Sequence, residues 1–148
     1  MNFFFNFILV ILSSTLLNTQ EWEQSFTAGE YDINGLFMGG SEVLNLIAHK
    51  NKLFASIGYW QDENNIWYGG DDLGIGWSQI ICLDNEDDNW KVDFDLGYNY
   101  LRPEILKQVI FTNDYNGIPL DAPDSLLIVG AYSPNYISGI ITANIFIR

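Results

Sequence analysis

A hairpin pattern in the middle of the chain constrains the fold more than any other feature. Two apolar runs lie on either side of a short polar segment centred on Lys50. Two further apolar runs follow, so the chain contains four predicted strands in succession: residues 43–48, 53–59, 77–83 and 90–96. Because turn-forming residues separate these runs, we expect the four strands to pair in chain order as an antiparallel meander over residues 42–97.

The residues that alternate along these strands predict which faces are buried. In the first two strands both faces carry apolar or small side chains, so we expect both faces to be covered by other parts of the protein. In the last strand, apolar residues alternate with charged ones: Trp90, Val92, Phe94 and Leu96 against Lys91, Asp93 and Asp95. The last strand should therefore have one apolar face and one face exposed to water.

The size and composition of the chain are those of one folded domain with a strongly acidic surface. Its 148 residues are 48% hydrophobic and 16% aromatic, which is enough for one hydrophobic core. A formal net charge of -13 would repel nucleic acids and anionic membranes, so neither is an expected partner. Cations, sugars, peptides and proteins remain. Cys82 is the only cysteine, so no disulfide can form within the chain.

The N-terminal segment has the pattern of a secretory signal peptide. Residues 3–17 are almost continuously apolar, and the polar residues 18–21 follow them. This length fits the hydrophobic region of a signal peptide and is short for a transmembrane helix; an uncleaved anchor is the alternative. We expect residues 1–20 to be removed and the mature chain to be free of the membrane, in a secreted, periplasmic or extracellular location.

Two pairs of segments repeat the same order of residues. The first pair shares one spacing of Trp, Phe and Gly: Trp22, Phe26 and Gly29 in one segment, and Trp90, Phe94 and Gly97 in the other. In the second pair, Glu42 and Glu104 each open an apolar run that leads to a second run ending in glycine. Such self-similarity is typical of repeat architectures. It predicts an outer strand of a preceding unit at residues 21–29, a complete unit at 42–97 and three strands of the next unit at 104–148. We expect the connection between the first two of these three strands to be a long loop at residues 112–124.

The complete unit resembles a blade of a kelch-like β-propeller. The resemblance is carried by the strand at residues 53–58, the run at 81–84 and the segment at 89–92. It implies an all-β fold of antiparallel four-stranded meanders arranged as in a β-propeller. Propellers close with about four to eight blades, whereas the predicted strands fill about two. We therefore expect an incomplete propeller, a fragment or open array completed by further blades or by another copy; a small sandwich or open barrel is the alternative.

The predicted meander also places the loops. The connection between its second and third strands lies at the same end of the sheet as the connection that leaves its fourth strand. Loops at that end carry the predicted ligand-binding residues: Trp60, Trp67, Tyr68, Asp71, Asp72, Tyr98, Tyr100, Arg102, Tyr132 and Tyr136. Aromatic rings beside polar groups suit stacking on sugars or gripping an extended peptide. Packing of these rings against the sheet is the alternative.

Other candidate sites have weaker patterns. The acidic run at residues 84–89 starts like a calcium loop but lacks its turn glycine and closing glutamate, so a solvated turn is the favoured interpretation. His49, the only histidine, is predicted to decorate the hairpin turn. Cys82 is predicted to be a buried, unreactive thiol. We predict neither a metal nor another cofactor.

Three functional hypotheses follow from these patterns. The first is an exported binding module, rather than an enzyme, that recognises a glycan, a peptide or a protein through its aromatic-rich loops. The second is part of a secreted carbohydrate-active propeller enzyme, in which Asp62 pairs with Asp71 or Asp72. The third is a purely structural repeat segment without a ligand.

Overall fold

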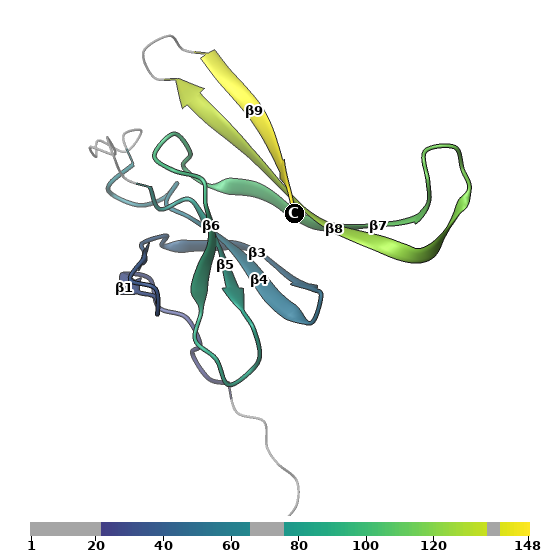
Figure 1. The fold of residues 1–148 in the computed structure, drawn as a ribbon. Coiled ribbons are helices and arrows are strands. Elements are labelled where there is room, and N and C mark those ends of the chain that lie inside the picture. Colours follow the sequence, from purple (N-terminus) through teal and green to yellow (C-terminus); the bar gives the residue numbers. More distant parts are fainter. Residues whose placement is uncertain (1–21, 66–75, 136–139) are drawn as a thin grey trace, which may run out of the picture.

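The computed structural model describes residues 22–65, 76–135 and 140–148, and these form strands and turns. The predicted all-β class is confirmed. Nine strands lie within these ranges: β1 (Glu30–Tyr31), β2 (Phe37–Met38), β3 (Glu42–His49), β4 (Lys52–Gly58), β5 (Gln79–Leu83), β6 (Lys91–Asp95), β7 (Pro103–Asn113), β8 (Pro119–Asn135) and β9 (Ile140–Ile147). They form three antiparallel sheets, in the orders β1-β2, β3-β4-β5-β6 and β7-β8-β9 (Figure 1). A helix long and apolar enough to cross a membrane is not found in the described ranges.

The predicted four-stranded meander is present as β3 to β6, paired in chain order. Its first turn is made by Lys50 and Asn51, which have φ values of 47° and 63°. Two successive residues with positive φ are typical of the hairpin turn whose twist matches that of the flanking strands, and asparagine tolerates this conformation well. Residues 54–58 of β4 and 79–82 of β5 are buried, so the central strands form the inside of the sheet.

The first strand of the meander is less buried than we predicted. Val43 and Leu46 of β3 are 57% and 60% exposed. The physical reason is that β3 lies at the edge of its sheet. Among the described strands it pairs only with β4, and β7 lies near it without pairing. The strands covered on both faces are the central ones, β4 and β5.

The simple alternation that we predicted along β6 is also wrong, because a β-bulge interrupts it. Ile81 lies opposite Val92, whereas the adjacent Ile80 lies opposite Phe94, so Asp93 is the extra residue. An extra residue moves the following side chains to the other face of a sheet. Phe94 therefore points toward the third sheet, where its ring lies 5.1 Å from that of Phe146, centroid to centroid.

Two apolar clusters cover the two faces of the meander. The first joins the meander to the third sheet and contains Phe54, Ile80, Cys82, Leu96, Leu106, Leu127, Val129 and Ala131. The second lies on the other face, toward the N-terminal residues, and contains Met38, Ala55, Ile57, Ile81 and Trp90. The meander is thus the middle layer of the molecule.

Residues 22–27 do not form the outer strand that we predicted. Their contacts with the meander are made by side chains: Phe26 packs edge-to-face on Trp90, and the indole N–H of Trp90 donates to Ser25 Oγ at 3.3 Å. Among the described residues, this segment has no strand pairing with the meander. It therefore covers an apolar face of the meander instead of extending a sheet. The short β1–β2 hairpin, which we did not predict, follows it.

Asp32, in the turn of that hairpin, attaches it to the edge of the meander. Its Oδ1 accepts the N–H groups of Asn34 and Leu36, both at 2.8 Å, and its Oδ2 accepts the N–H of Val92 in β6 at 2.9 Å. Burial alone would raise the pKa of Asp32, but these backbone hydrogen bonds hold it below its usual value. The carboxylate therefore stays charged while it accepts a hydrogen bond at the outer edge of β6.

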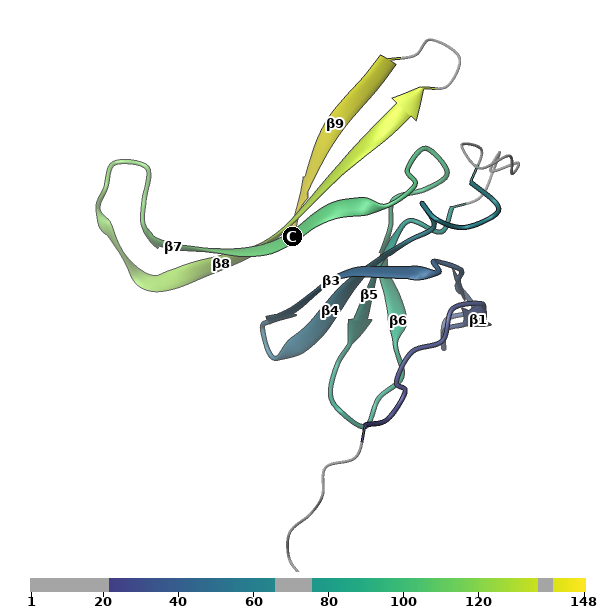
Figure 2. The same cartoon turned by 180° about the vertical axis from the view of Figure 1, so that it is seen from behind.

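The third sheet contains a hairpin much longer than predicted. We expected a loop at residues 112–124, but β7 continues to Asn113 and β8 begins at Pro119. Asp114 Oδ1 accepts the N–H groups of Asn116 and Ile118 and closes the turn. Residues 110–125, which we call the hairpin arm, extend away from the other sheets, except that Ser125 at the base of the arm contacts His49 of β3 (Figures 1 and 2). β8 then continues past the arm and pairs with β9.

The two larger sheets approach each other at β7, which lies beside β3 and β4, and diverge toward β6 and β9. A cavity of about 470 Å³ lies in the space between them, lined by side chains such as Phe94, Leu127 and Phe146. An ion pair between Asp93 and Arg148 forms part of its lining.

Candidate functional site

The loop that follows β4 and the loop that precedes β7 meet at one end of the meander, as the topology predicted. The N–H of Tyr59 donates to the carbonyl oxygen of Leu101 at 3.0 Å. The two segments are so close that a Cβ atom at Gly58 would lie 2.3 Å from the Cβ of Arg102. Only glycine fits this contact without a backbone shift. The close approach brings Trp60 and Arg102 together.

Three predicted ligand-binding residues converge at this end, and we call them the loop-end cluster: Trp60, Arg102 and Tyr132. The guanidinium carbon of Arg102 lies over the Trp60 ring, 5.3 Å from its centroid. The Trp60 and Tyr132 rings are 6.4 Å apart at an interplanar angle of 69°. Both geometries are favourable aromatic contacts. The residues come from three separate parts of the chain, and none of the three side chains is fully buried.

Two carboxylates that we did not predict as site residues hold Arg102 in place. Arg102 Nε donates to Glu104 Oε1 at 2.8 Å, and Arg102 Nη1 lies 3.7 Å from Glu42 Oε2. Glu42 also accepts the backbone N–H of Gln61, next to Trp60. The signal that could have found them was in the sequence, because Glu42 and Glu104 are the residues that open the two similar apolar runs.

The charges of the cluster are stable near neutral pH. Burial would lower the pKa of Arg102, but its hydrogen bond to Glu104 and the nearby carboxylates raise the pKa above its usual value. Burial, together with the charge of Glu104, raises the pKa of the Tyr132 hydroxyl. Tyr132 therefore keeps its proton, and the cluster offers one phenol and one guanidinium beside an indole ring, with the carboxylates of Glu42 and Glu104 next to them.

Of the other seven predicted residues, the structure describes two, Tyr98 and Tyr100. Tyr100 packs on Phe146 at 5.8 Å between ring centroids and belongs to the rim of the core, so for this residue the packing alternative is correct. Tyr98 is 65% exposed and remains available at the surface. The remaining five lie outside the described residues: Trp67, Tyr68, Asp71, Asp72 and Tyr136.

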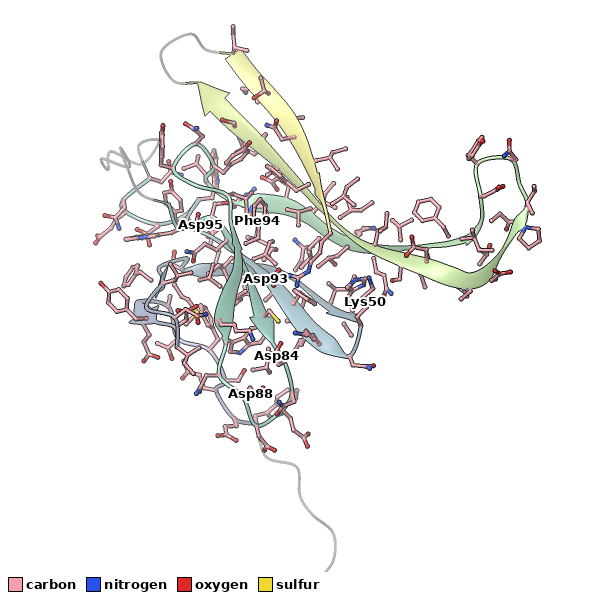
Figure 3. All side chains as sticks on the ribbon, viewed as in Figure 1. Lys50, Asp84, Asp88, Asp93, Phe94 and Asp95 are labelled. Carbon is pink, nitrogen blue, oxygen red and sulfur yellow. The ribbon has the colours of Figure 1, made fainter. Side chains whose placement is uncertain are left out.

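Ion pairs organise the opposite end of the meander. Asp84 forms ion pairs with two lysines from neighbouring strands. Lys52 Nζ lies 2.6 Å from Asp84 Oδ1, and Lys91 Nζ contacts Asp84 Oδ2. These two lysines hold the pKa of Asp84 well below its usual value. Figure 3 shows that Asp84 and Asp88 lie at this end of the meander, whereas Asp95 lies at the other end of β6. In the described part of the chain, no three His, Cys, Asp or Glu side chains are grouped as a metal site would require.

Three other residues singled out in the sequence, His49, Cys82 and Asp62, contact the fold around them. His49 does not decorate the turn as predicted; it is only 3% exposed, and its Nδ1 lies 3.3 Å from Ser125 Oγ of β8. Burial lowers the pKa of His49, and burial raises that of Cys82 to about 11. Asp62 accepts the N–H of Asn64 at 2.9 Å and thereby stabilises its own turn.

No protein-family model, no curated protein and no solved structure matches this chain. What the loop-end cluster can do follows from its own groups. The carboxylates of Glu42 and Glu104, which lie beside the cluster, are both paired with Arg102. Rings and hydrogen-bonding groups held in fixed positions are suited to binding a ligand.

Proposed function

We propose that this protein is an exported, non-catalytic binding module of β-propeller type that recognises a neutral glycan through the loop-end cluster. One observation carries the proposal: Trp60, Arg102 and Tyr132, which come from different parts of the chain, meet at one end of the meander. Glu42 and Glu104 fix the cationic member of this group.

The charges of the cluster favour a neutral, hydroxyl-rich ligand. The net charge of -13 disfavours polyanions, and Arg102 is already neutralised by two carboxylates. Carboxylate oxygens accept hydrogen bonds from sugar hydroxyls, while the Tyr132 hydroxyl can donate or accept. An indole ring adds a rigid apolar surface on which a sugar ring can pack.

The arrangement of the sheets supports the propeller part of the proposal. A four-stranded meander is followed directly by a three-stranded one, and both run in chain order. They approach each other at β3 and β7, the first strand of each sheet, and diverge toward β6 and β9. Blades that fan out from a common centre have this relation between neighbouring sheets.

A glycan array probed with the full chain tests the function. We expect binding to neutral oligosaccharides, and the Trp60→Ala variant should weaken it about tenfold or more, as loss of a central aromatic contact does. Trp22→Ala is a matched control because Trp22 is fully exposed and far from the cluster in the sequence. Thermal unfolding of each variant distinguishes loss of binding from loss of fold.

Three results of this experiment would contradict the proposal. Absence of binding to every glycan would overturn the ligand class. Unchanged binding by folded Trp60→Ala protein would remove the loop-end cluster as the site. Binding to extended peptides that depends on Trp60 would keep the site but replace the glycan by a peptide.

A further inference from the structure

In the described part of the chain, β9 forms an open edge of the third sheet. In the described residues its only strand partner is β8, and the eight residue pairs between them run without a register shift. Three apolar side chains of β9, those of Ile141, Ile145 and Ile147, are 67%, 71% and 64% exposed. Natural proteins usually protect such an edge with charges, prolines or bulges. β9 has none of them, since residues 140–147 contain no charged residue and no proline.

The hydrogen bonds to β8 fix which groups of β9 face outward. Arg148 and Leu127 exchange both of their backbone hydrogen bonds, at 2.9 and 3.0 Å. In an antiparallel pair such residues alternate with residues whose N–H and C=O groups point to the other side. Every second residue before Arg148 pairs with β8 through its backbone, and the residues between them face the other way. The backbone groups of four residues therefore point to the open edge: Ile141, Ala143, Ile145 and Ile147.

We propose that two copies of this chain associate by antiparallel pairing of β9 with β9 of the second copy. A two-fold axis at Asn144, perpendicular to the sheet, sets Ile141 opposite Ile147 of the second copy and Ala143 opposite Ile145 of the second copy. All four outward-facing residues then exchange hydrogen bonds. A shift by two residues would leave at least one of them outside the pairing within the described strand. The resulting sheet has six strands and continues from one copy into the other.

Charge points to a second copy at this edge rather than elsewhere on the surface. Each copy carries a net charge of -13, so two copies repel each other wherever their acidic surfaces meet. The uncharged strand β9 is a place where they can touch without opposing carboxylates. Apolar contact also follows, because the exposed isoleucines of the two strands lie on the same face of the joined sheet.

Light scattering coupled to size-exclusion chromatography tests the association. We expect a concentration-dependent dimer that becomes stronger as salt is added, because salt screens the repulsion between the copies. Ala143→Pro should weaken the dimer about tenfold or more, since it removes an outward N–H that β8 does not use. Circular dichroism should show that this variant remains folded.

Cysteine cross-linking tests the register independently. At the two-fold axis the two Asn144 residues form a pair without backbone hydrogen bonds, with Cα atoms about 4.5 Å apart, within the range that a disulfide spans. Asn144→Cys should therefore form a disulfide-linked dimer under mild oxidation. Thr142→Cys is the matched control, because Thr142 faces Phe146 of the second copy. The unmodified chain is a second control, since its Cys82 is buried.

A monomer at every protein and salt concentration would overturn the proposal. So would a species larger than a dimer, because a two-fold pairing closes on itself. Equal cross-linking at positions 142 and 144, or a dimer unaffected in folded Ala143→Pro protein, would show that the copies meet elsewhere. None of these outcomes depends on whether the loop-end cluster binds a glycan.

Discussion

The meander and the third sheet use similar residues but reach very different degrees of burial. In β4 every residue from position 54 to 58 is buried, whereas in β9 none of residues 140–147 is buried. Both strands contain mostly apolar or small residues. The difference lies in the layers around them: β4 has an apolar cluster on each face, and β9 lies at an edge. Apolar composition thus shows where a strand can be buried, and the neighbouring layers decide whether it is.

The hairpin arm is the extreme case within the third sheet. Ile110, Phe111 and Tyr115 are 59%, 45% and 97% exposed. A two-stranded hairpin without a covering layer is only marginally stable in water. We therefore expect the arm to contribute little to the stability of the domain.

The largest predicted effect compares two isoleucines, one in each region. Ile81 in β5 is fully buried, so Ile81→Ala should lower the free energy of unfolding by about 3–4 kcal/mol through lost burial and a cavity. Ile110→Ala in the arm should cost about 1 kcal/mol or less. Urea denaturation followed by fluorescence measures both. A similar cost at both positions would mean that the arm is covered in solution.

The second prediction compares local opening. Backbone amides in the paired part of the arm, such as Phe111, should exchange with solvent on the order of a hundredfold faster than those at the centre of β4 and β5. The reason is that opening the arm exposes little additional apolar surface, whereas the central strands open only with the core. Hydrogen exchange followed by NMR measures the ratio. Equal protection in both regions would make the domain one cooperative unit.

The smallest predicted effect is the pH dependence of the stability that the Asp84 ion pairs provide at the end of the meander opposite the loop-end cluster. The pKa of Asp84 is held below its ordinary value of 3.8 in the folded protein by Lys52 and Lys91. A lowered folded pKa means that the ion pairs stabilise the fold above the ordinary pKa, and that this contribution is lost as pH falls toward the folded pKa. The stability difference between the unmodified chain and Asp84→Asn should therefore shrink below about pH 4.

Denaturation curves at a series of pH values measure this difference. Asp121→Asn in the hairpin arm is the control, because Asp121 is exposed and lies outside the meander. A stability difference for Asp84→Asn that stays constant down to the lowest pH would show that these ion pairs do not stabilise the fold.

Much of the meander could be predicted from the sequence, because its signals are local. The four apolar runs and the Lys50–Asn51 turn are determined by neighbouring residues, and the shared end of two loops follows from antiparallel pairing. The same reasoning placed Trp60 and Arg102 at one end. The close approach of Trp60 and Arg102 could not be predicted, because it depends on Gly58. Gly58 touches Arg102, which lies more than forty residues further along the chain.

The features that the sequence did not predict have causes far away along the chain. The bulge at Asp93 depends on how β6 pairs with β5, and no residue type marks it. The beginning of β8 contains Pro119 and Pro123, and because proline is unusual in strands the sequence predicts a loop there instead of a long hairpin. Asp32 looked like an ordinary turn residue, and its bond to Val92 depends on the packing of the N-terminal hairpin.

The hydrogen bond from the Val92 N–H to Asp32 makes the outer strands β6 and β9 differ in their ability to add a strand. The carboxylate takes a hydrogen-bonding position on β6 that a neighbouring strand would otherwise use. At β9, by contrast, the corresponding backbone groups face outward. One outer edge is thus blocked by a side chain of the protein itself, and the other is free to add a strand. A single aspartate thus blocks strand addition at the β6 edge of one sheet, whereas the β9 edge of the other sheet keeps the backbone groups that the proposed two-fold pairing uses.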